Sequence, residues 1–336
     1  MDKYSAPLKI SFDKFIENNA LKSFMRLPFS RELEGVDIAV AGVPFDLATT
    51  NRAGTRFGPR YLRDKGLRSA ISDVDLDINI SENLKCVDYG DFELQLGYLP
   101  DSFHKITQQT KEILDAGATP IIVGGDHAIT FPELEAFYYK YGKMALVHFD
   151  SHLDTGRSLK NDETRDFYHH GNPFYWALRR GYVDGNHMIQ LGIRGGFMDG
   201  TSADEFSKEH GREYILAKDL HRMSYDEAAK RIRDKVGDMP VFVTFDIDFL
   251  DPAYAPGTGT PVVGGFSVHD AVMIMEKALI GLDIKGADLV EVMPYYDPGE
   301  LTANAGSTIL SKLLSIIAYN KLKAKCEAEA VQQEKA

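Results

Sequence analysis

The chain has 336 residues, of which 44% are hydrophobic and 26% are charged, as in an ordinary globular protein. This composition excludes a disordered or fibrous chain, and the length is sufficient to bury a large core. The formal net charge of −12 at pH 7 argues against nucleic acid or an anionic lipid surface as a partner, because like charges repel. An acidic surface suits a cationic small-molecule substrate.

Cysteine usage and the N-terminal residues indicate the compartment. Cys86 and Cys326 are the two cysteines, and neither belongs to a C-x-x-C pair, so we expect no disulfide framework and no cysteine-ligated zinc. Residues 1–19 lack the apolar region of a secretory signal. Apolar runs stay short of the roughly 20 residues that span a bilayer. We therefore expect a cytoplasmic protein with no membrane partner.

Short β-branched apolar runs alternate with longer amphipathic segments. The apolar runs predict strands at 37–43, 120–123, 144–149, 187–193, 240–247 and 287–292. The amphipathic segments predict helices at 102–116, 131–141, 225–236, 268–280 and from 303 onward. Ser224 is the expected N-cap of the third helix. This alternation predicts an α/β fold, in which a mostly parallel sheet lies between two layers of helices.

The alternation of predicted strands and helices continues along the chain without interruption. The sequence contains no Gly/Ser/Pro-rich linker and no repeat of 20–50 residues. We therefore predict a single domain over 1–336, with residues 1–35 as an N-terminal extension and the polar stretch 321–336 as a helical tail.

Three short motifs follow predicted strands, at the edge of a parallel sheet where ligands bind. They are Gly124-Gly-Asp-His127, Asp150-Ser-His-Leu-Asp154 and Asp246-Ile-Asp248. In an extended segment, side chains two residues apart share one face, so we expect each Asp-x-His or Asp-x-Asp set to point the same way.

Taken singly, each motif has a purely structural alternative, a turn or a polar strand end. Taken together, they bring to one edge of the sheet the four carboxylates of Asp150, Asp154, Asp246 and Asp248 and the two imidazoles of His127 and His152. Close carboxylates repel and are costly to bury unless a cation lies between them. The set therefore fits two divalent cations, with Mn²⁺ favoured by the many oxygen ligands and Ni²⁺, Co²⁺ or Zn²⁺ also compatible. Two such metals can activate water as a nucleophile.

The stretch Thr244-Phe-Asp-Ile-Asp-Phe-Leu-Asp-Pro-Ala-Tyr-Ala-Pro-Gly-Thr-Gly-Thr-Pro261 resembles the third signature of the ureohydrolases, which include arginase, agmatinase and their guanidino-acid relatives. The other two motifs resemble the first two signatures, in the family's order. The resemblance spans about residues 37–319 and is closer to agmatinase, through Gly42-Val-Pro-Phe-Asp46 and Glu291-Val-Met-Pro-Tyr-Tyr-Asp297. It implies the three-layer α/β/α arginase-like fold, with about eight strands.

The resemblance also implies how the metals are held. It assigns one ion to His127, Asp150, Asp154 and Asp246. It assigns the other to His152, Asp150, Asp246 and Asp248. In this family a hydroxide held between the metals attacks the guanidinium carbon, urea and an amine are released, and the residue at Asp154 passes a proton to the leaving nitrogen.

Two further catalytic residues rest on the resemblance. His170, followed by Gly171, resembles the family's proton-shuttling histidine, and Glu300 resembles the carboxylate that pairs with the guanidinium. Without the resemblance, His170 would be interpreted as a surface residue and Glu300 as a residue favoured by the dipole at a helix start. His169 is an adjacent candidate for the role of His170.

The substrate implied is agmatine, hydrolysed to putrescine and urea. Arginine is disfavoured, because glycines replace the polar groups that bind an α-amino acid. The loop 155–169 is longer than in a typical agmatinase, and the candidate contacts to the substrate tail are Arg157, Arg165, His169 and Phe197. Because basic and acidic residues balance in this loop, other guanidines stay open: 4-guanidinobutyrate, 3-guanidinopropionate, guanidine itself, or an alkylated biguanide such as metformin, with Ni²⁺ as the metal.

The resemblance implies a homotrimer or homohexamer, and a hetero-oligomer with a paralogue is an alternative. Two other classes of function are weighed against the enzyme. A non-catalytic partner subunit would be expected to have lost metal ligands, and none is missing here. A deacetylase on the same fold would use one zinc and would not need Asp248.

Overall fold

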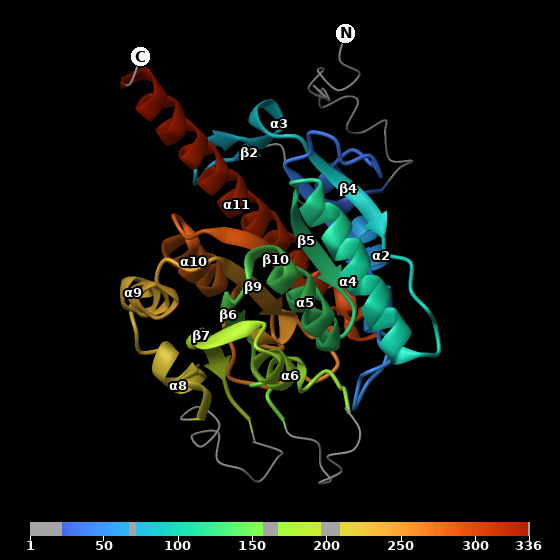
Figure 1. Ribbon diagram of the computed structural model, residues 1–336. Coiled ribbons are helices and arrows are strands. Elements are labelled where there is room, and N and C mark those ends of the chain that lie inside the picture. The colour runs from blue at the N-terminus through green and yellow to red at the C-terminus, as the bar shows by residue number, and fades with distance from the viewer. Residues whose placement is uncertain (1–21, 67–71, 157–166, 196–208, 335–336) are drawn as a thin grey trace.

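The computed structural model describes residues 22–66, 72–156, 167–195 and 209–334, with side chains to 327. An eight-stranded sheet lies at its centre, in the order β4-β1-β5-β10-β9-β6-β7-β8 (Figure 1). All neighbouring strands in it are parallel. The strands are β1 (Ile38–Val43), β4 (Cys86–Asp91), β5 (Thr119–Gly124), β6 (Met144–Phe149), β7 (Val183–Ile193), β8 (Glu213–Leu216), β9 (Val241–Asp246) and β10 (Ile284–Val290). The predicted fold class is confirmed.

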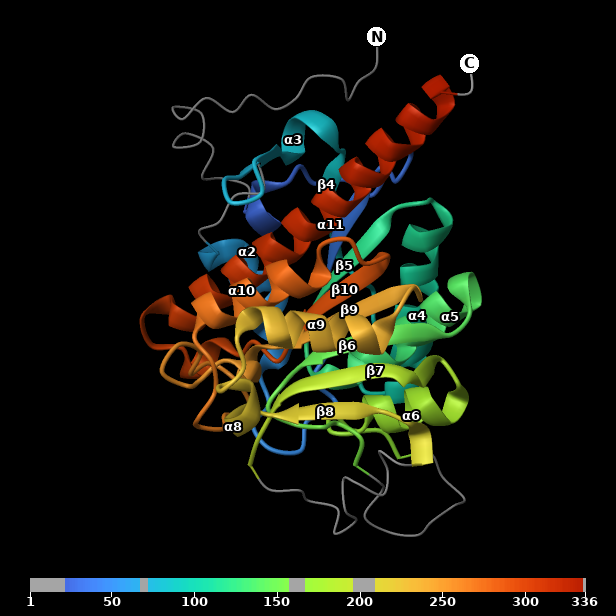
Figure 2. The same ribbon diagram turned by 90° about the vertical axis from the view of Figure 1, so that its left-hand side faces the viewer.

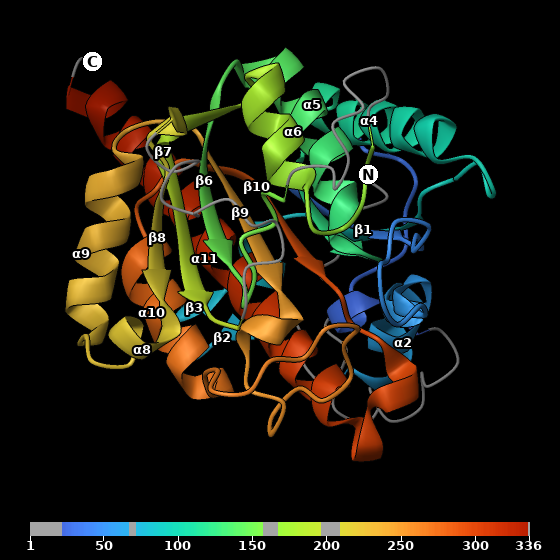
Figure 3. The ribbon, with the colours of Figure 1, turned by 90° about the horizontal axis from the view of Figure 1, so that it is seen from below.

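Helices cover both faces of the sheet (Figure 3). One face, turned to the viewer in Figure 2, carries α2 (Gly58–Lys65), α9 (Tyr225–Val236), α10 (Val268–Leu279) and α11 (Leu301–Glu334). The other face carries α4 (Leu99–Asp115), α5 (Thr130–Tyr141) and α6 (Pro173–Arg180). The smaller elements are β2 (Ser72–Asp73) and β3 (Ile78–Asn79), which form an antiparallel pair, α3 (Ile80–Asn83), α8 (Ala217–Leu220), and the 3₁₀ helices η1 (Phe24–Arg26), η2 (Thr55–Phe57), η3 (His127–Ile129), η4 (Ile247–Phe249), η5 (Pro294–Tyr296) and η6 (Pro298–Glu300).

Alternate residues of each central strand enter two separate cores. Val147 of β6 and Val243 of β9 pack toward α9, α10 and α11. Their neighbours Leu146 and Phe242 pack toward α4, α5 and α6. Because both faces of the strands are buried, their sequences are apolar nearly throughout.

The six predicted strands and five predicted helices are all present, with ends shifted by a few residues. Ser224 is the N-cap of α9, and its side chain and Glu227 form a reciprocal capping box. The strands β4 and β8 and the helices α2 and α6 were not predicted. β4 is interrupted by two aspartates and a glycine, and the other three elements are short, with 4 residues in β8 and 8 residues each in α2 and α6.

The last helix passes a length and hydropathy test for a membrane span over Pro298–Glu327, with a mean hydropathy of 1.2. However, 78% of its most apolar window is buried inside the protein, so this segment is a core helix packed on the sheet. Beyond the sheet α11 continues to Glu334, past the body of the protein (Figure 1).

The strands that precede the three motifs lie together at the centre of the sheet. β5, β10, β9 and β6 are consecutive neighbours, and their carboxyl ends are level, with Phe149 opposite Phe245 and Val290 opposite Asp246. The residues that follow these strands therefore meet at one edge.

Candidate active site

The Gly-Gly-Asp-His segment forms a tight turn from β5 into η3. The Asp126 side chain accepts a hydrogen bond from the backbone N–H of Ala128 and another from Ala48. A Cβ atom at Gly125 would lie 2.0 Å from the carbonyl oxygen of Phe45, so a side chain cannot fit there. The structural interpretation of this motif as an Asx-type turn is correct, and the turn is what carries His127 into the site.

His127 faces three carboxylates. Its Nδ1 atom lies 2.9 Å from Oδ2 of Asp154, 3.2 Å from Oδ2 of Asp150 and 3.5 Å from Oδ2 of Asp246. The nitrogen is buried, yet it makes no hydrogen bond with acceptable angles to any of them. Its other nitrogen, Nε2, lies 2.9 Å from the Thr244 hydroxyl. A buried nitrogen that converges with three carboxylate oxygens fits the coordination of a shared cation.

His152 faces a second group of carboxylates. Its Nδ1 atom lies 3.1 Å from Oδ2 of Asp248 and 3.4 Å from Oδ1 of Asp150. Asp248 is held in place by the backbone N–H and the hydroxyl of Ser151, both of which donate to its Oδ1. Asp150 therefore lies between the two histidines and belongs to both groups.

The two Asp-containing segments do not continue their strands, contrary to the prediction. Asp154 has a left-handed backbone, with φ of 49°, which directs its carboxylate to His127 while His152 faces Asp248. Asp248 lies in η4, where its backbone N–H donates to the Asp246 carboxylate at 2.7 Å. A shared strand face is therefore not what brings these side chains together. Local turns do so.

Burial and mutual repulsion dominate the electrostatics of the site. Burial and the nearby Asp248 and Asp150 raise the pKa of Asp246 well above its usual value. Burial acts in the same direction on Asp150, but the adjacent His148 and His127 outweigh it and hold its pKa well below the usual range. These opposed shifts are expected where several carboxylates share too little positive charge, a deficit that divalent cations would fill.

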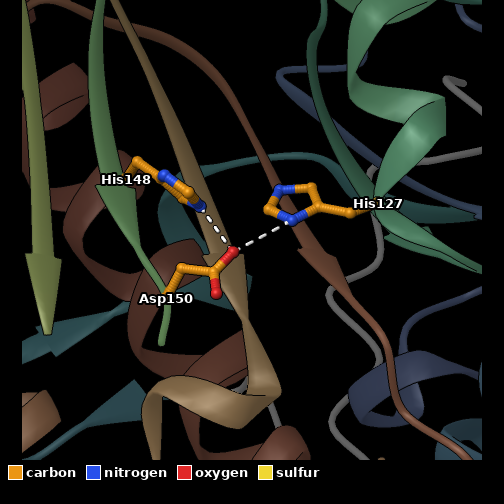
Figure 4. Close-up of side chains that lie close together, drawn as sticks. All are labelled: His127, His148 and Asp150. Atoms are coloured by element: carbon orange, nitrogen blue, oxygen red, sulfur yellow. Dashed lines mark hydrogen bonds and ion pairs between the residues drawn. The ribbon is translucent and has the colours of Figure 1, made fainter. Parts of the chain in front are cut away.

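His148 is a site residue that the sequence analysis missed. It lies at the end of β6, fully buried, and its Nε2 atom is 2.7 Å from Oδ2 of Asp150 (Figure 4). The ring of Phe174 packs against the rings of both His148 and His127, so this aromatic residue belongs to the core. The available signal was a histidine inside an otherwise apolar buried strand.

Glu291 is a second missed residue, directly after β10. Its backbone is left-handed, with φ of 64°, and its side chain is buried. Oε1 accepts hydrogen bonds from the backbone N–H of His127 and from Nδ1 of His170, both at 2.9 Å. Oε2 is buried and has no hydrogen-bond partner. The signal was an acidic residue at the carboxyl end of an apolar strand.

His170 lies in the site and not on the surface, with 8% of its area exposed. Its Nε2 atom is 2.6 Å from the Thr50 hydroxyl. Burial alone would lower its pKa, but the Glu291 carboxylate outweighs burial and raises the pKa to about 9. His169 is half-buried, and its Nδ1 accepts the backbone N–H of Gly171 at 3.1 Å.

The expectation for Glu300 is wrong. Its carboxylate pairs with Nζ of Lys65 at 2.8 Å, and 42% of its side chain is exposed. It lies in η6, immediately before α11, as expected of a residue that stabilises a helix start. The predicted contacts Arg157, Arg165 and Phe197 lie outside the described residues.

A sequence model of the Arginase family matches residues 36–315 of this chain. The chain belongs to the arginase family. It is 38% identical over 314 residues to an agmatinase of Shigella sonnei, an alignment that covers 92% of this chain and 97% of that protein.

Two solved structures support the same placement of this arginase-family chain. A hypothetical agmatinase from Burkholderia thailandensis has a TM-score of 0.82 and 37% identity, covering 91% of this chain and 93% of that one. Proclavaminate amidino hydrolase from Streptomyces clavuligerus has a TM-score of 0.83 and 33% identity, covering 89% and 98%. The predicted family and the enzyme class, a ureohydrolase, are confirmed.

The arginase-family site fits a pair of metal ions. Among the described residues, two groups of potential ligand atoms each lie within 4.8 Å of one another, His127/His148/Asp150 and Asp150/His152/Asp248. They share Asp150, as expected for a binuclear centre with a bridging carboxylate.

Proposed function

We propose that this enzyme hydrolyses agmatine to putrescine and urea. The bond between the guanidinium carbon and the substituted nitrogen breaks, and the oxygen of water becomes the carbonyl oxygen of urea. The protons of that water pass to the nitrogens of the products. The proposal is supported by the similarity to agmatinases over nearly the whole chain and by the geometry of the acidic site.

Two divalent cations complete the proposed site. His127, Asp150, Asp154 and Asp246 would hold one ion, and His152, Asp150, Asp246 and Asp248 would hold the other. Bound there, the ions would activate water and stabilise negative charge. Mn²⁺ is the proposed metal because carboxylate oxygens dominate the ligand set, and Ni²⁺ is the alternative.

Glu291 carries the proposed recognition of the guanidinium. Its unpartnered Oε2 is a buried anionic acceptor beside the metal ligands, which is costly unless a cationic group occupies it. A guanidinium group can donate two N–H bonds to such a carboxylate. This single observation favours a guanidine substrate, and it gives Glu291 the role that the sequence predicted for Glu300.

Asp154 and His170 are the proposed proton carriers. Asp154 is partly accessible and faces His127, so it can hold a proton and deliver it to the leaving amine. His170 bridges Glu291 and the Thr50 hydroxyl, which places an exchangeable proton beside the group that binds the substrate.

The substrate is tested by measuring urea release from the enzyme loaded with Mn²⁺ and, separately, with Ni²⁺. The panel is agmatine, 4-guanidinobutyrate, 3-guanidinopropionate, arginine, guanidine and metformin. We expect agmatine to be favoured by at least about 100-fold in kcat/KM, roughly 2.7 kcal/mol of discrimination. A preference for another member of the panel would identify that guanidine as the substrate instead of agmatine. No urea release from any member of the panel, with two metal ions bound, would support the alternative that the protein is a non-catalytic partner subunit.

The remaining proposals concern assembly and location. From the family we propose a homotrimer or homohexamer in the cytoplasm, with a paralogue as the alternative partner. Light scattering of the purified enzyme tests the assembly, because a monomeric mass would contradict it.

A further inference from the structure

A buried chain of side chains runs from the metal-binding loop to the start of β8. It contains Asp150, His148, Gln190 of β7 and Arg212, which precedes β8. All four are buried, with Arg212 the most accessible at 4%. We infer that Gln190, oriented by Arg212, is a positioning residue that fixes the ring proton of His148 and thereby the orientation of Asp150. The inference rests on the proposed function only in taking Asp150 as a metal ligand.

The direction of each hydrogen bond follows from Arg212. A guanidinium can only donate, so the atom of Gln190 that it contacts is the carbonyl oxygen Oε1. The amide nitrogen Nε2 must then face the other side. There it donates to the backbone carbonyl of Leu153 at 2.6 Å, a group that can only accept. Two independent partners therefore fix the orientation of the amide.

The same nitrogen of Gln190 lies 2.8 Å from Nδ1 of His148. Because the amide nitrogen donates, Nδ1 of His148 must accept, and the ring proton must lie on Nε2. That Nε2–H points at Oδ2 of Asp150, 2.7 Å away. His148 thus donates to the carboxylate, and because its Nδ1 already accepts from Gln190, Nε2 could ligate a metal only by giving up the last proton of the ring. His148 therefore acts through Asp150.

Gln190 contacts the metal-binding loop at a second point. Leu153, whose carbonyl it binds, precedes Asp154, and Asp154 has the left-handed backbone that turns its carboxylate toward His127. One amide therefore restrains Asp150 through His148 and Asp154 through the backbone. Residues that orient metal ligands in this way commonly change metal affinity 10- to 100-fold when they are altered.

The testing variant is Gln190→Glu, which keeps the size and the oxygen that faces Arg212. A carboxylate cannot donate to Nδ1 of His148 and can only accept from it, so Nδ1 should carry a proton in the variant. The contact with the Leu153 carbonyl should be lost, because both groups are acceptors. We expect Mn²⁺ affinity, measured by competition with a chelator, to fall about 10- to 100-fold. The ¹⁵N spectrum of the histidine rings should show Nδ1 of His148 without a proton in the metal-free wild type and with a proton in the variant.

Gln109→Glu is the matched control. Gln109 on α4 likewise uses both ends of its amide: the nitrogen donates to the backbone carbonyls of Glu93 and Lys105, and the oxygen accepts the backbone N–H of Glu93, none of which is a site residue. The Mn²⁺ affinity of the Gln109→Glu variant should equal that of the wild type. His148→Phe identifies the His148 signal by its loss from the spectrum.

An Nδ1–H form of His148 in the wild type would overturn the inference without any variant, even if Gln190→Glu fails to fold. Unchanged Mn²⁺ affinity in a folded Gln190→Glu protein would also overturn it. The proposed function is judged separately, by urea release from the wild type. A wild type that binds metal but hydrolyses no guanidine would refute that function and leave the role of Gln190 standing.

Discussion

Nδ1 of His170 lies 2.9 Å from Oε1 of Glu291, and this contact joins two loops that are 121 positions apart in the sequence. The same oxygen accepts the backbone N–H of His127, so one carboxylate links the substrate-binding region to the turn that carries a candidate metal ligand. Because Oε1 is held twice and Oε2 is not held at all, Glu291 presents one oriented acceptor to a substrate.

The first prediction separates Glu291 from Glu300. Glu291→Gln preserves shape and removes the charge that pairs with a guanidinium, so we expect kcat/KM for agmatine to fall about 100-fold or more. Metal content should remain at the wild-type value. Glu300→Gln, which breaks only an exposed pair with Lys65, should leave kcat/KM within about threefold. The reassignment fails if the two variants lose activity equally.

The second prediction concerns stability and pH. Glu291 raises the pKa of His170 to about 9 against burial, from a usual value of 6.5. A histidine whose pKa is higher in the folded than in the unfolded state stabilises the folded protein at pH values below its unfolded-state pKa. This contribution is lost as the pH rises through 9. In the metal-free protein, His170→Asn should therefore lower the free energy of unfolding more at pH 6 than at pH 10, by on the order of 3 kcal/mol.

Urea unfolding at both pH values checks this, with His104→Asn, an exposed position on α4, as the control. A His170→Asn deficit that is the same at pH 6 and pH 10 would contradict the assigned pairing with Glu291.

The third prediction follows from the histidines that face the carboxylates. Burial favours a neutral ring at His152, but Asp248 and Asp150 outweigh it and raise its pKa to about 12 in the absence of metal. The pKa of His127 is raised as well, by Asp150, Asp154 and Asp246. Since a metal binds only the neutral ring, Mn²⁺ must displace these protons, and its apparent affinity should rise with pH.

Titration calorimetry near pH 7.5, in buffers of different ionisation enthalpy, measures the protons released. We expect at least one per ion bound. Binding heats that are the same in all buffers would show that these histidines release no protons when the metal binds, and hence that they are not ligands.

The fourth prediction concerns the glycine before Asp126. A methyl group at Gly125 would overlap the backbone of Phe45, so Gly125→Ala should cost about 2–3 kcal/mol and displace His127. Gly117→Ala introduces a left-handed alanine, with φ of 84°, into open space and should cost about 1 kcal/mol with metal affinity unchanged. Equal metal affinity and stability in the two variants would contradict this account of the motif.

The sequence was sufficient to predict the fold and to place the candidate metal ligands close together. Apolar strands between amphipathic helices define a doubly covered parallel sheet, and residues after strand ends must meet at its edge. His127, Asp150 and Asp248 could therefore be placed at one edge without coordinates.

What the sequence could not supply is local geometry. Asp154 and Glu291 reach the site through left-handed backbones, which no side-chain periodicity predicts for these residue types. Glu300 and Glu291 are nine positions apart, and they are told apart by the burial of Glu291 and by its contacts with His127 and His170. His148 looked like part of an apolar strand because the partner that orients its ring, Gln190, lies 42 positions away on the neighbouring strand β7.

The most direct test of the central claim is to count metal ions and measure urea and putrescine in the same preparations of the wild type and Asp248→Asn. Asn keeps an oxygen for the Ser151 hydroxyl and N–H, so the fold should persist while a charged ligand is lost. We predict two Mn²⁺ per wild-type chain with urea and putrescine formed in equal amounts from agmatine, and less than two ions with little activity in the variant. Full urea release from Asp248→Asn, or a wild type active without bound metal, would contradict the account.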